Sequence, residues 1–310
     1  MCLSVVICTY NPKLPVLKKV LDALKEQSLP RSDWELLVID NCSTPPLSAS
    51  LDLSWHPAAR IIVEEKAGLS HARIAGVQNS KADLIVFADD DNVLESDYLE
   101  NAFQFSANHP EVGCFGGRSL PVYETVPPHW FKDTGINLGC QDYGPELHIS
   151  NFAVDGFKVR NYPEKAPIGT GMVILKKAFL SYLQDAANNP ERMKLGRRGK
   201  SLSSGEDNDI ILSIVKCGYE IAYVPKLVVH HFLPANRYQE DYLKRMAFES
   251  NRTWVKVLEI HGINPWRKIR PYSYAPRKVK SYLTNRAWKS PLAAIRWRSA
   301  CGLFKGLSEL

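Results

Sequence analysis

The 310-residue sequence lacks several features that would assign it to a simple class. It has no uninterrupted apolar run near the ~20 residues that a transmembrane helix needs. Its first ten residues contain no Lys or Arg and no small-residue cleavage site, so they favour a strand over a signal peptide. Its seven cysteines are scattered without a C-x-x-C pair, which argues against a disulfide framework or a zinc site. These absences predict a cytoplasmic protein.

The composition is that of an ordinary globular protein, but its charge is unevenly spread. Hydrophobic residues make up 45% and charged residues 23% of the chain, which excludes wholesale disorder. Residues 265–310 hold eleven Lys or Arg and one acid, Glu309, so this basic tail carries a net charge of +10. The preceding residues hold 28 bases against 32 acids, a net charge of −4, so only the tail would seek an anionic partner.

Short apolar runs alternate with amphipathic stretches over the first 115 residues. This pattern predicts strands at 4–9, 35–40, 60–63 and 84–88, and helices at 16–27 and 69–79. Near-continuous apolar strands separated by helices are typical of the α/β class, with a mostly parallel sheet and helices on both faces.

The second half of the chain is less regular at first. Residues 116–167 are rich in Pro, Gly and aromatic side chains, which indicates an irregular region that covers a substrate. Further strands are predicted at 168–175, 220–224 and 227–231, and helices at 178–187, 205–216, 238–261 and 276–290, with Pro291 interrupting the last helix.

Polar side chains follow three of the early strands at the point where each strand ends. Thr9, Asp40 and the triplet Asp89-Asp90-Asp91 occupy these positions. Because open α/β sheets bind ligands outside the carboxyl ends of their strands, these side chains are expected at one rim. Adjacent carboxylates repel one another unless a cation neutralises them, and Mg²⁺ or Mn²⁺ prefers such oxygen ligands. The alternative for the triplet is a loop in which one Asp caps a helix near Ser96 and the other two acids are solvated.

A second acidic motif, Gly205-Glu206-Asp207-Asn208-Asp209, begins a predicted helix. Acids in the first turn of a helix stabilise its dipole, which is the simpler explanation. The functional alternative is a general base: Asp207 would deprotonate an attacking hydroxyl, and Glu206 or Asp209 would position it.

Six motifs in order resemble the family 2 glycosyltransferases of the GT-A fold. They are SVVICTYN, LLVIDNCST, AGLSHAR, FADDD, GTGM and GED-N-D followed by CGYEIAYVPKLVVHH, and they extend from about residue 3 to residue 235. The resemblance implies a Rossmann-like GT-A domain with a nucleotide-sugar-binding half (1–115), an acceptor-binding half (116–235) and a helical C-terminal extension (236–310). Relatives of this kind act in surface or extracellular polysaccharide assembly.

The resemblance also implies roles for individual residues. Donor-binding residues are expected at Thr9, Tyr10, Asn11, Asp40, Gly68, Arg73, Asp89 and Asp90. Metal ligands are expected at Asp91, at Asp89 and, less specifically, at His231. Asp207 matches the base, with Glu206 and Asp209 as supporting acids. The central residue of the family's D-x-D motif is usually not acidic, so Asp90 leaves open which carboxylate does which task.

Several other side chains have two interpretations each. Only one of His230 and His231 can face the site, because adjacent strand residues point in opposite directions, and either also suits a structural hydrogen bond. Trp130 would either stack on an acceptor sugar or pack in the core. Arg197 and Arg198 are expected in a solvated loop rather than at the diphosphate.

The basic tail combines Lys and Arg with tryptophans and an apolar stripe. This combination suits a helix on an anionic membrane surface, and the alternative is a helical hairpin that packs on the catalytic body. RNA binding ranks last because no recognition motif accompanies the charge, so no nucleic acid is expected.

The sequence thus predicts an inverting, metal-dependent glycosyltransferase that moves a sugar from a nucleotide donor, a UDP-sugar, to a saccharide or lipid-linked acceptor. Its location would be the cytoplasm or the inner face of the membrane. The main alternative is a catalytically silent, nucleotide-binding scaffold subunit. A nucleotidyltransferase is disfavoured because CTYNPKLP is not a Gly-rich phosphate loop.

Overall fold

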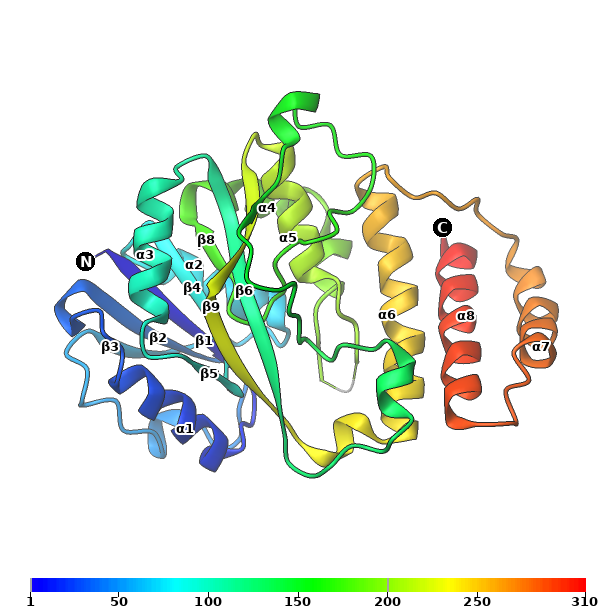
Figure 1. The fold of residues 1–310 in the computed structure, drawn as a ribbon, viewed down its shortest axis with the longest axis horizontal. Helices are drawn as coiled ribbons and strands as arrows, with labels where there is room; N and C mark the ends of the chain where they lie inside the picture. Colours follow the sequence, from blue (N-terminus) through cyan, green and yellow to red (C-terminus); the bar gives the residue numbers. More distant parts are fainter. Residues whose placement is uncertain (1, 200) are drawn as a thin grey trace.

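The computed structural model describes residues 2–199 and 201–310, which form a curved sheet flanked by helices and a C-terminal helical group (Figure 1). The strands are β1 (Leu3–Thr9), β2 (Trp34–Asp40), β3 (Ala59–Val63), β4 (Leu84–Asp89), β5 (Asn92–Leu94), β6 (Val112–Tyr123), β7 (His148–Ile149), β8 (Val173–Leu175) and β9 (Glu220–Leu233). The helices are α1 (Leu14–Lys25), α2 (Leu69–Asn79), α3 (Tyr98–Asn108), α4 (Lys176–Asn188), α5 (Glu206–Lys216), α6 (Glu240–Ile260), α7 (Tyr274–Thr284) and α8 (Pro291–Glu309).

The sheet has the strand order β3-β2-β1-β4-β8-β6-β9-β5, and β7 pairs with β9. β1 is parallel to β2 and β4, and β2 is parallel to β3. α2, α4 and α5 cover one face and α1 and α3 the other, so the strands between them are buried on both sides (Figure 1). All residues of β1 and β2 are buried, which explains their continuous apolar runs. The predicted α/β class is confirmed.

The register of the parallel strands aligns their carboxyl ends. Thr9 pairs with Asp40, and Cys8 pairs with Asp89. The ends of β1, β2 and β4 therefore meet at one edge of the sheet, as the sequence predicted.

Several predictions for the second half were wrong. The strand predicted at 168–175 begins only at Val173. β6 continues to Tyr123, so residues 116–123 lie in a strand rather than in an irregular segment, and β9 runs unbroken through Pro225. The two strands are parallel, with a register shift between Gly116 and Arg118. The predicted boundary between residues 115 and 116 falls within β6, so both predicted halves share one sheet.

The C-terminal extension also differs from the prediction. Pro291 does not break a helix but occupies the first turn of α8, where its missing N–H removes no helical hydrogen bond. α8 lies between α6 and α7 (Figure 1). A Cβ atom at Gly302 of α8 would lie 2.1 Å from the carbonyl oxygen of Phe248, so only glycine permits this approach to α6. Glu309 accepts hydrogen bonds from Arg252 at 2.8 Å and fixes the end of α8 to α6.

Within the residues that the structure describes, the helices are too short or too polar to cross a membrane.

Candidate active site

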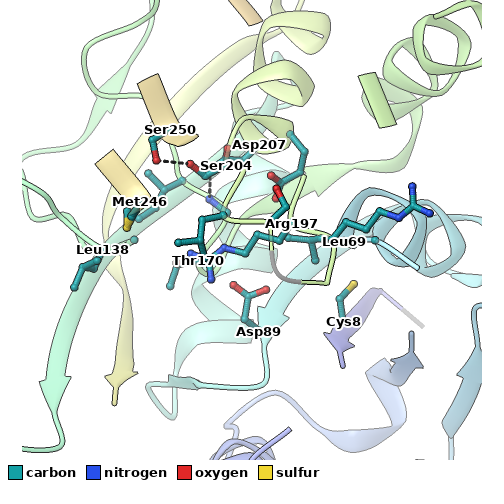
Figure 2. A pocket seen from close by; sticks show the side chains of 18 of the residues that line it. Cys8, Leu69, Asp89, Leu138, Thr170, Arg197, Ser204, Asp207, Met246 and Ser250 are labelled. Atoms are coloured by element: carbon teal, nitrogen blue, oxygen red, sulfur yellow. Dashed lines mark hydrogen bonds between the residues drawn. The ribbon is translucent and has the colours of Figure 1, made fainter. Parts of the chain in front are cut away.

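A cleft of about 820 Å³ opens beside the carboxyl ends of β1 and β4. The loops after β1, β2 and β4, the N-terminal ends of α2 and α5, and one side of α6 form its walls. In Figure 2, Asp89 lies on one side and Asp207 on the other, with Arg197 between them. The predicted site residues that line the cleft are Thr9, Tyr10, Gly68, Arg73, Asp89, Asp90, Asp91, Glu206, Asp207 and His231. Asn11, Asp40 and Asp209 are not among the lining residues.

The acidic triplet lies in the tight turn between β4 and β5. The Thr9 hydroxyl donates a hydrogen bond to Asp90, which joins the end of β1 to this turn. Asn92 donates to Asp91 Oδ1 at 3.0 Å. Because β5 pairs with β9 and places Asn92 opposite His231, the histidine reaches the same turn.

His231 and His230 point in opposite directions, as strand geometry requires. His231 Nε2 lies 3.4 Å from Asp91 Oδ1, and this imidazole is buried in the cleft. His230 Nε2 instead contacts Glu95 Oε1 at 2.6 Å, outside the cleft. Arg237 also contacts Asp91, with 3.2 Å between Arg237 Nη2 and Asp91 Oδ2.

The carboxyl groups of the triplet have different proton affinities. Burial, together with the charges of Asp91 and Asp89, raises the pKa of Asp90 to about 7, although the hydrogen bond from Thr9 opposes this rise. Burial also raises the pKa of Asp89, although Arg73 opposes this. Burial also acts to raise the pKa of Asp91, but the hydrogen bond and charge of His231, together with the charges of Arg237 and Arg197, lower this pKa overall.

The pKa of His231 is shifted in the direction opposite to that of Asp91. Burial disfavours its charged form, but the contact with Asp91 raises its pKa to about 9, so it is protonated at neutral pH. His231 and Arg237 therefore place two positive charges against Asp91.

The residues at this turn fit a divalent ion that is shared with a ligand. In the described ranges, no three His, Cys, Asp or Glu side chains converge on a metal position. Mg²⁺ commonly takes only one or two carboxylates from the protein and completes its shell with phosphate oxygens and water. Asp91 and Asp89 provide such oxygens at the cleft surface, and His231 would become a ligand only after it loses its proton.

Asp207 lies at the N-terminal end of α5, across the cleft from the triplet. Its Oδ2 accepts a hydrogen bond from the Gly169 backbone N–H at 3.1 Å, and its Oδ1 accepts one from Asn208 N–H at 2.9 Å. The carboxylate is half-buried, so it is held in one orientation while it remains open to the cleft.

Glu206 and Arg73 form a buried ion pair below Asp207. Glu206 Oε1 lies 3.0 Å from Arg73 Nη1, and both side chains are almost fully buried. Burial raises the pKa of Glu206, while the Arg73 charge opposes that rise. Arg73 also donates to the Gly169 carbonyl at 3.4 Å, so it supports the loop that orients Asp207. A contact between Arg73 and the donor stays a prediction.

Three predicted donor-binding residues make internal contacts in the loops around the cleft. Asp40 accepts backbone hydrogen bonds from Ser43 and Leu47 at 3.0 and 2.8 Å. Asn11 Oδ1 accepts from Thr44 N–H at 2.8 Å. The Gly68 N–H donates to the Asn41 side chain at 2.7 Å, which ties the start of α2 to the end of β2. Direct donor contacts from these residues stay predictions.

The structure does not bring Asp209 to the cleft. This residue is fully buried on another side of α5, where Asp209 Oδ1 contacts Arg192 at 2.9 Å and His261 at 2.6 Å. These contacts connect α5 to the end of α6. Asp209 therefore stabilises the packing of α5 and does not support Asp207 in the cleft.

Sequence reasoning placed Arg197 in solvent, and it did not find Arg237. Arg198 is exposed and Arg197 is half-buried, and both arginines line the cleft. Burial disfavours the charge of Arg197, yet the nearby Tyr242, Glu206 and two triplet acids raise its pKa overall. The basic residues before the acidic motif indicated that Arg197 could lie near the site. No local pattern indicated Arg237, which contacts Asp91 only because the chain folds back after β9.

Trp130 packs beside the cluster formed by Phe131, Tyr238 and Leu243, and it is not a lining residue of the cleft. The core-packing interpretation of this tryptophan is therefore the one that the structure supports.

Comparison of the sequence with known protein families finds a match to one family model. The sequence profile described as Glycosyl transferase family 2 matches residues 4–183, more than half of the chain. The succinoglycan biosynthesis protein ExoM of Rhizobium meliloti (strain 1021) is 26% identical over 269 residues, which cover 83% of this chain and 76% of ExoM.

Solved structures resemble the whole chain. Residues 1–349 of S. aureus TarS in complex with UDP match with a TM-score of 0.51 and 15% identity, over 100% of this chain and 90% of TarS 1–349. The mannosyltransferase PcManGT from Pyrobaculum calidifontis, in complex with GDP-Man and Mn²⁺, matches with a TM-score of 0.57 and 17% identity, over 99% of this chain and 87% of that one. At such identities the likeness concerns the fold alone, and it confirms the predicted GT-A fold.

Proposed function

The chain belongs to glycosyl transferase family 2, and from this premise we propose that it is an inverting, metal-dependent glycosyltransferase that uses a UDP-sugar. The acceptor is a saccharide or a lipid-linked saccharide in surface or extracellular polysaccharide synthesis. The observation that carries this proposal is that Asp91 after β4 and Asp207 of α5 line one cleft. The UDP bound to TarS, the Mn²⁺ bound to PcManGT and the role named for ExoM support it.

Asp207 is the proposed general base. An acceptor hydroxyl in the cleft gives its proton to the Asp207 carboxylate while its oxygen bonds to the anomeric carbon of the donor sugar. The bond from that carbon to the diphosphate breaks, and UDP leaves with the electron pair. One base on the face opposite the leaving group gives inversion in a single displacement, without a second carboxylate nucleophile.

The charge that develops on the diphosphate needs positive partners in the cleft. A bound Mn²⁺ or Mg²⁺ would supply Lewis-acid stabilisation of that charge, and Asp91 with Asp89 would hold the ion. Arg197 and Arg237 would hydrogen-bond phosphate oxygens, because both guanidinium groups line the cleft near the triplet.

Nucleotide binding tests the donor and the metal together. We expect UDP with Mn²⁺ to raise the melting temperature by about 5 °C at a UDP concentration about 100 times its Kd, because a ligand that binds only the folded state stabilises it. UDP without Mn²⁺, or ADP with Mn²⁺, should raise it much less. Differential scanning fluorimetry measures all three shifts.

Asp91→Asn is the matching variant, since it removes one charge from the metal position. It should lose the Mn²⁺-dependent part of the shift, whereas Asp133→Asn, on an exposed segment outside the cleft, should keep it. An unchanged Mn²⁺ effect in Asp91→Asn would refute the metal site, and equal shifts with every nucleotide would refute UDP selectivity.

We further propose that the outer surface of the C-terminal extension attaches reversibly to the inner face of an anionic membrane. α7 and the turn after it expose Val279, Leu283 and Trp288, whose side chains are 61%, 59% and 56% exposed, beside Lys280 and Lys289. Apolar and basic groups on one surface favour binding to anionic lipid, at about 1 kcal/mol per basic side chain.

Vesicle sedimentation tests this attachment. The protein should sediment with phosphatidylglycerol vesicles but not with phosphatidylcholine vesicles, and the variant Lys280→Glu with Lys289→Glu should bind at least about tenfold more weakly. The control variant Lys18→Glu with Lys226→Glu has the same net charge, and its changes are exposed on other elements. Equal loss in both variants would mean that only net charge matters.

A further inference from the structure

One wall of the cleft comes from α6, a helix beyond the residues that the family profile matches. Met246, Ser250 and Trp254 are spaced four residues apart, so they lie along one side of α6, and all three line the cleft. Asn251 joins them from the same side. Figure 2 shows Ser250 and Met246 on the same side of the cleft as Asp207.

The packing of α6 brings this wall close to the proposed base. Thr253 and Val257 of α6 pack directly on the backbone at Gly205, two residues before Asp207. Trp254 lies between these two contacts in the sequence, and both Trp254 and Asp207 line the cleft. Trp254 and Asp207 therefore lie on two elements that pack against each other and line the same cleft.

A neighbouring aromatic ring fixes the orientation of Trp254. The Tyr162 ring meets the indole edge to face, with centroids 5.0 Å apart and an interplanar angle of 78°. The Tyr162 hydroxyl donates to Asn208 Oδ1 at 3.3 Å, which links this aromatic pair to the residue after Asp207. Trp254 is half-buried and belongs to none of the hydrophobic clusters of the described chain, so part of its ring is open to the cleft.

The polar groups beside Trp254 are neutral. Ser250 Oγ lies 3.0 Å from Ser204 Oγ, and either hydroxyl can donate. Asn251 uses its amide N–H on the Ala247 carbonyl at 2.8 Å, which leaves its side-chain oxygen without a protein donor among the described residues. This wall thus differs from the side of the cleft that holds the acidic triplet, where His231 and Arg237 contact Asp91.

We propose that α6 forms the acceptor subsite, in which the Trp254 indole packs against the C–H face of a neutral sugar ring while Ser250 and Asn251 hydrogen-bond its hydroxyls. This inference rests on the proposed glycosyltransferase function. An aromatic face with a few neutral hydrogen-bonding groups suits a pyranose, whereas a lipid chain would leave those groups unpaired and a phosphate would require cations. Acceptor choice then depends on the C-terminal extension, in addition to the irregular loops that the sequence indicated.

Saturation-transfer difference NMR with simple sugars tests this subsite without knowledge of the natural acceptor. The probes are the methyl glycosides of glucose, galactose, mannose and N-acetylglucosamine, added to the full chain with UDP and Mn²⁺. At least one probe should bind to the wild-type protein. Trp254→Ala should weaken that binding about tenfold or more, while Trp254→Phe, which keeps an aromatic face, should weaken it about threefold or less.

Two controls separate this inference from the proposed function. Trp288→Ala removes an exposed tryptophan outside the cleft, and it should bind the sugar as the wild type does. The melting-temperature shift with UDP and Mn²⁺ should be unchanged in Trp254→Ala, which also shows that this variant is folded. If UDP stabilises both proteins but the sugar binds both equally, or binds neither, the acceptor subsite is refuted while the donor site stands. If UDP fails to stabilise the wild type, the proposed function itself is refuted.

Discussion

Replacing Asp207 by Asn should lower the rate of sugar transfer by a factor of about 10² to 10⁴. The amide cannot accept the proton of the acceptor hydroxyl at neutral pH. Its side-chain oxygen can still accept the Gly169 N–H hydrogen bond, so the loop and the donor site should keep their shape. The measurement is UDP release in the presence of acceptor, with the UDP-induced melting shift of the same variant as the test of donor binding.

The variant Asp207→Glu gives the matching control of geometry. It keeps a carboxylate but moves it by about one C–C bond, so it should retain more transfer activity than Asp207→Asn. Wild-type transfer rates in Asp207→Asn would exclude this residue as the base. A wild-type protein that binds UDP but transfers no sugar to any acceptor would favour the scaffold alternative.

Replacing Arg73 by Met should lower the free energy of unfolding by about 3–5 kcal/mol. The methionine fills much of the same volume, but it leaves the buried Glu206 carboxylate without its partner at 3.0 Å. The expected loss is a large part of the ~5–15 kcal/mol that stabilises a typical domain. Urea unfolding followed by circular dichroism measures it.

Two further variants distinguish a buried unpaired charge from simple loss of packing. Arg73→Met combined with Glu206→Gln should recover most of the stability, because the second change removes the unpaired charge. Arg118→Met, which breaks the surface pair with Asp142, should lower the free energy of unfolding far less than Arg73→Met does. An Arg73→Met loss as small as that of Arg118→Met would mean that Glu206 does not carry a charge.

The first half of the fold could be predicted because its signals are local. β1, β2 and β4 are short apolar runs, and parallel strands must bring their carboxyl ends together, so Thr9 and the acidic triplet meet at one edge. The second half depends on distant pairing. Residues 116–123 contain Gly-Gly and Pro121, which favour irregular structure, yet they extend β6 along β9.

Local contacts in the structure explain this exception. A Cβ atom at Gly117 would lie 2.1 Å from the carbonyl oxygen of Leu227, so the close approach at the register shift requires glycine. Pro121 lies beyond the part of β6 that pairs with β8, on an open edge where its missing N–H removes no ladder hydrogen bond.

The residues of the candidate site likewise fall into those that the local sequence indicates and those that only the fold brings together. The acidic triplet follows the apolar strand β4, and Asp207 lies in the first turn of α5. Both positions can be read from the local sequence pattern. Arg197, Arg237 and Trp254 come from a loop, a helical turn and a helix that approach the cleft only when the chain is folded. No local periodicity marks such residues.

The close contact between α6 and α8 connects the C-terminal helix to one wall of the cleft. α6 presents its inner side to the cleft, while its outer side is covered by α8 through the glycine at 302 and the Glu309 contacts. A chain shortened before Pro291 would uncover the side of α6 that packs against α8, and it would loosen the wall of the cleft that α6 forms. If the proposed acceptor subsite is correct, removal of this basic end would therefore change the binding of sugars along α6.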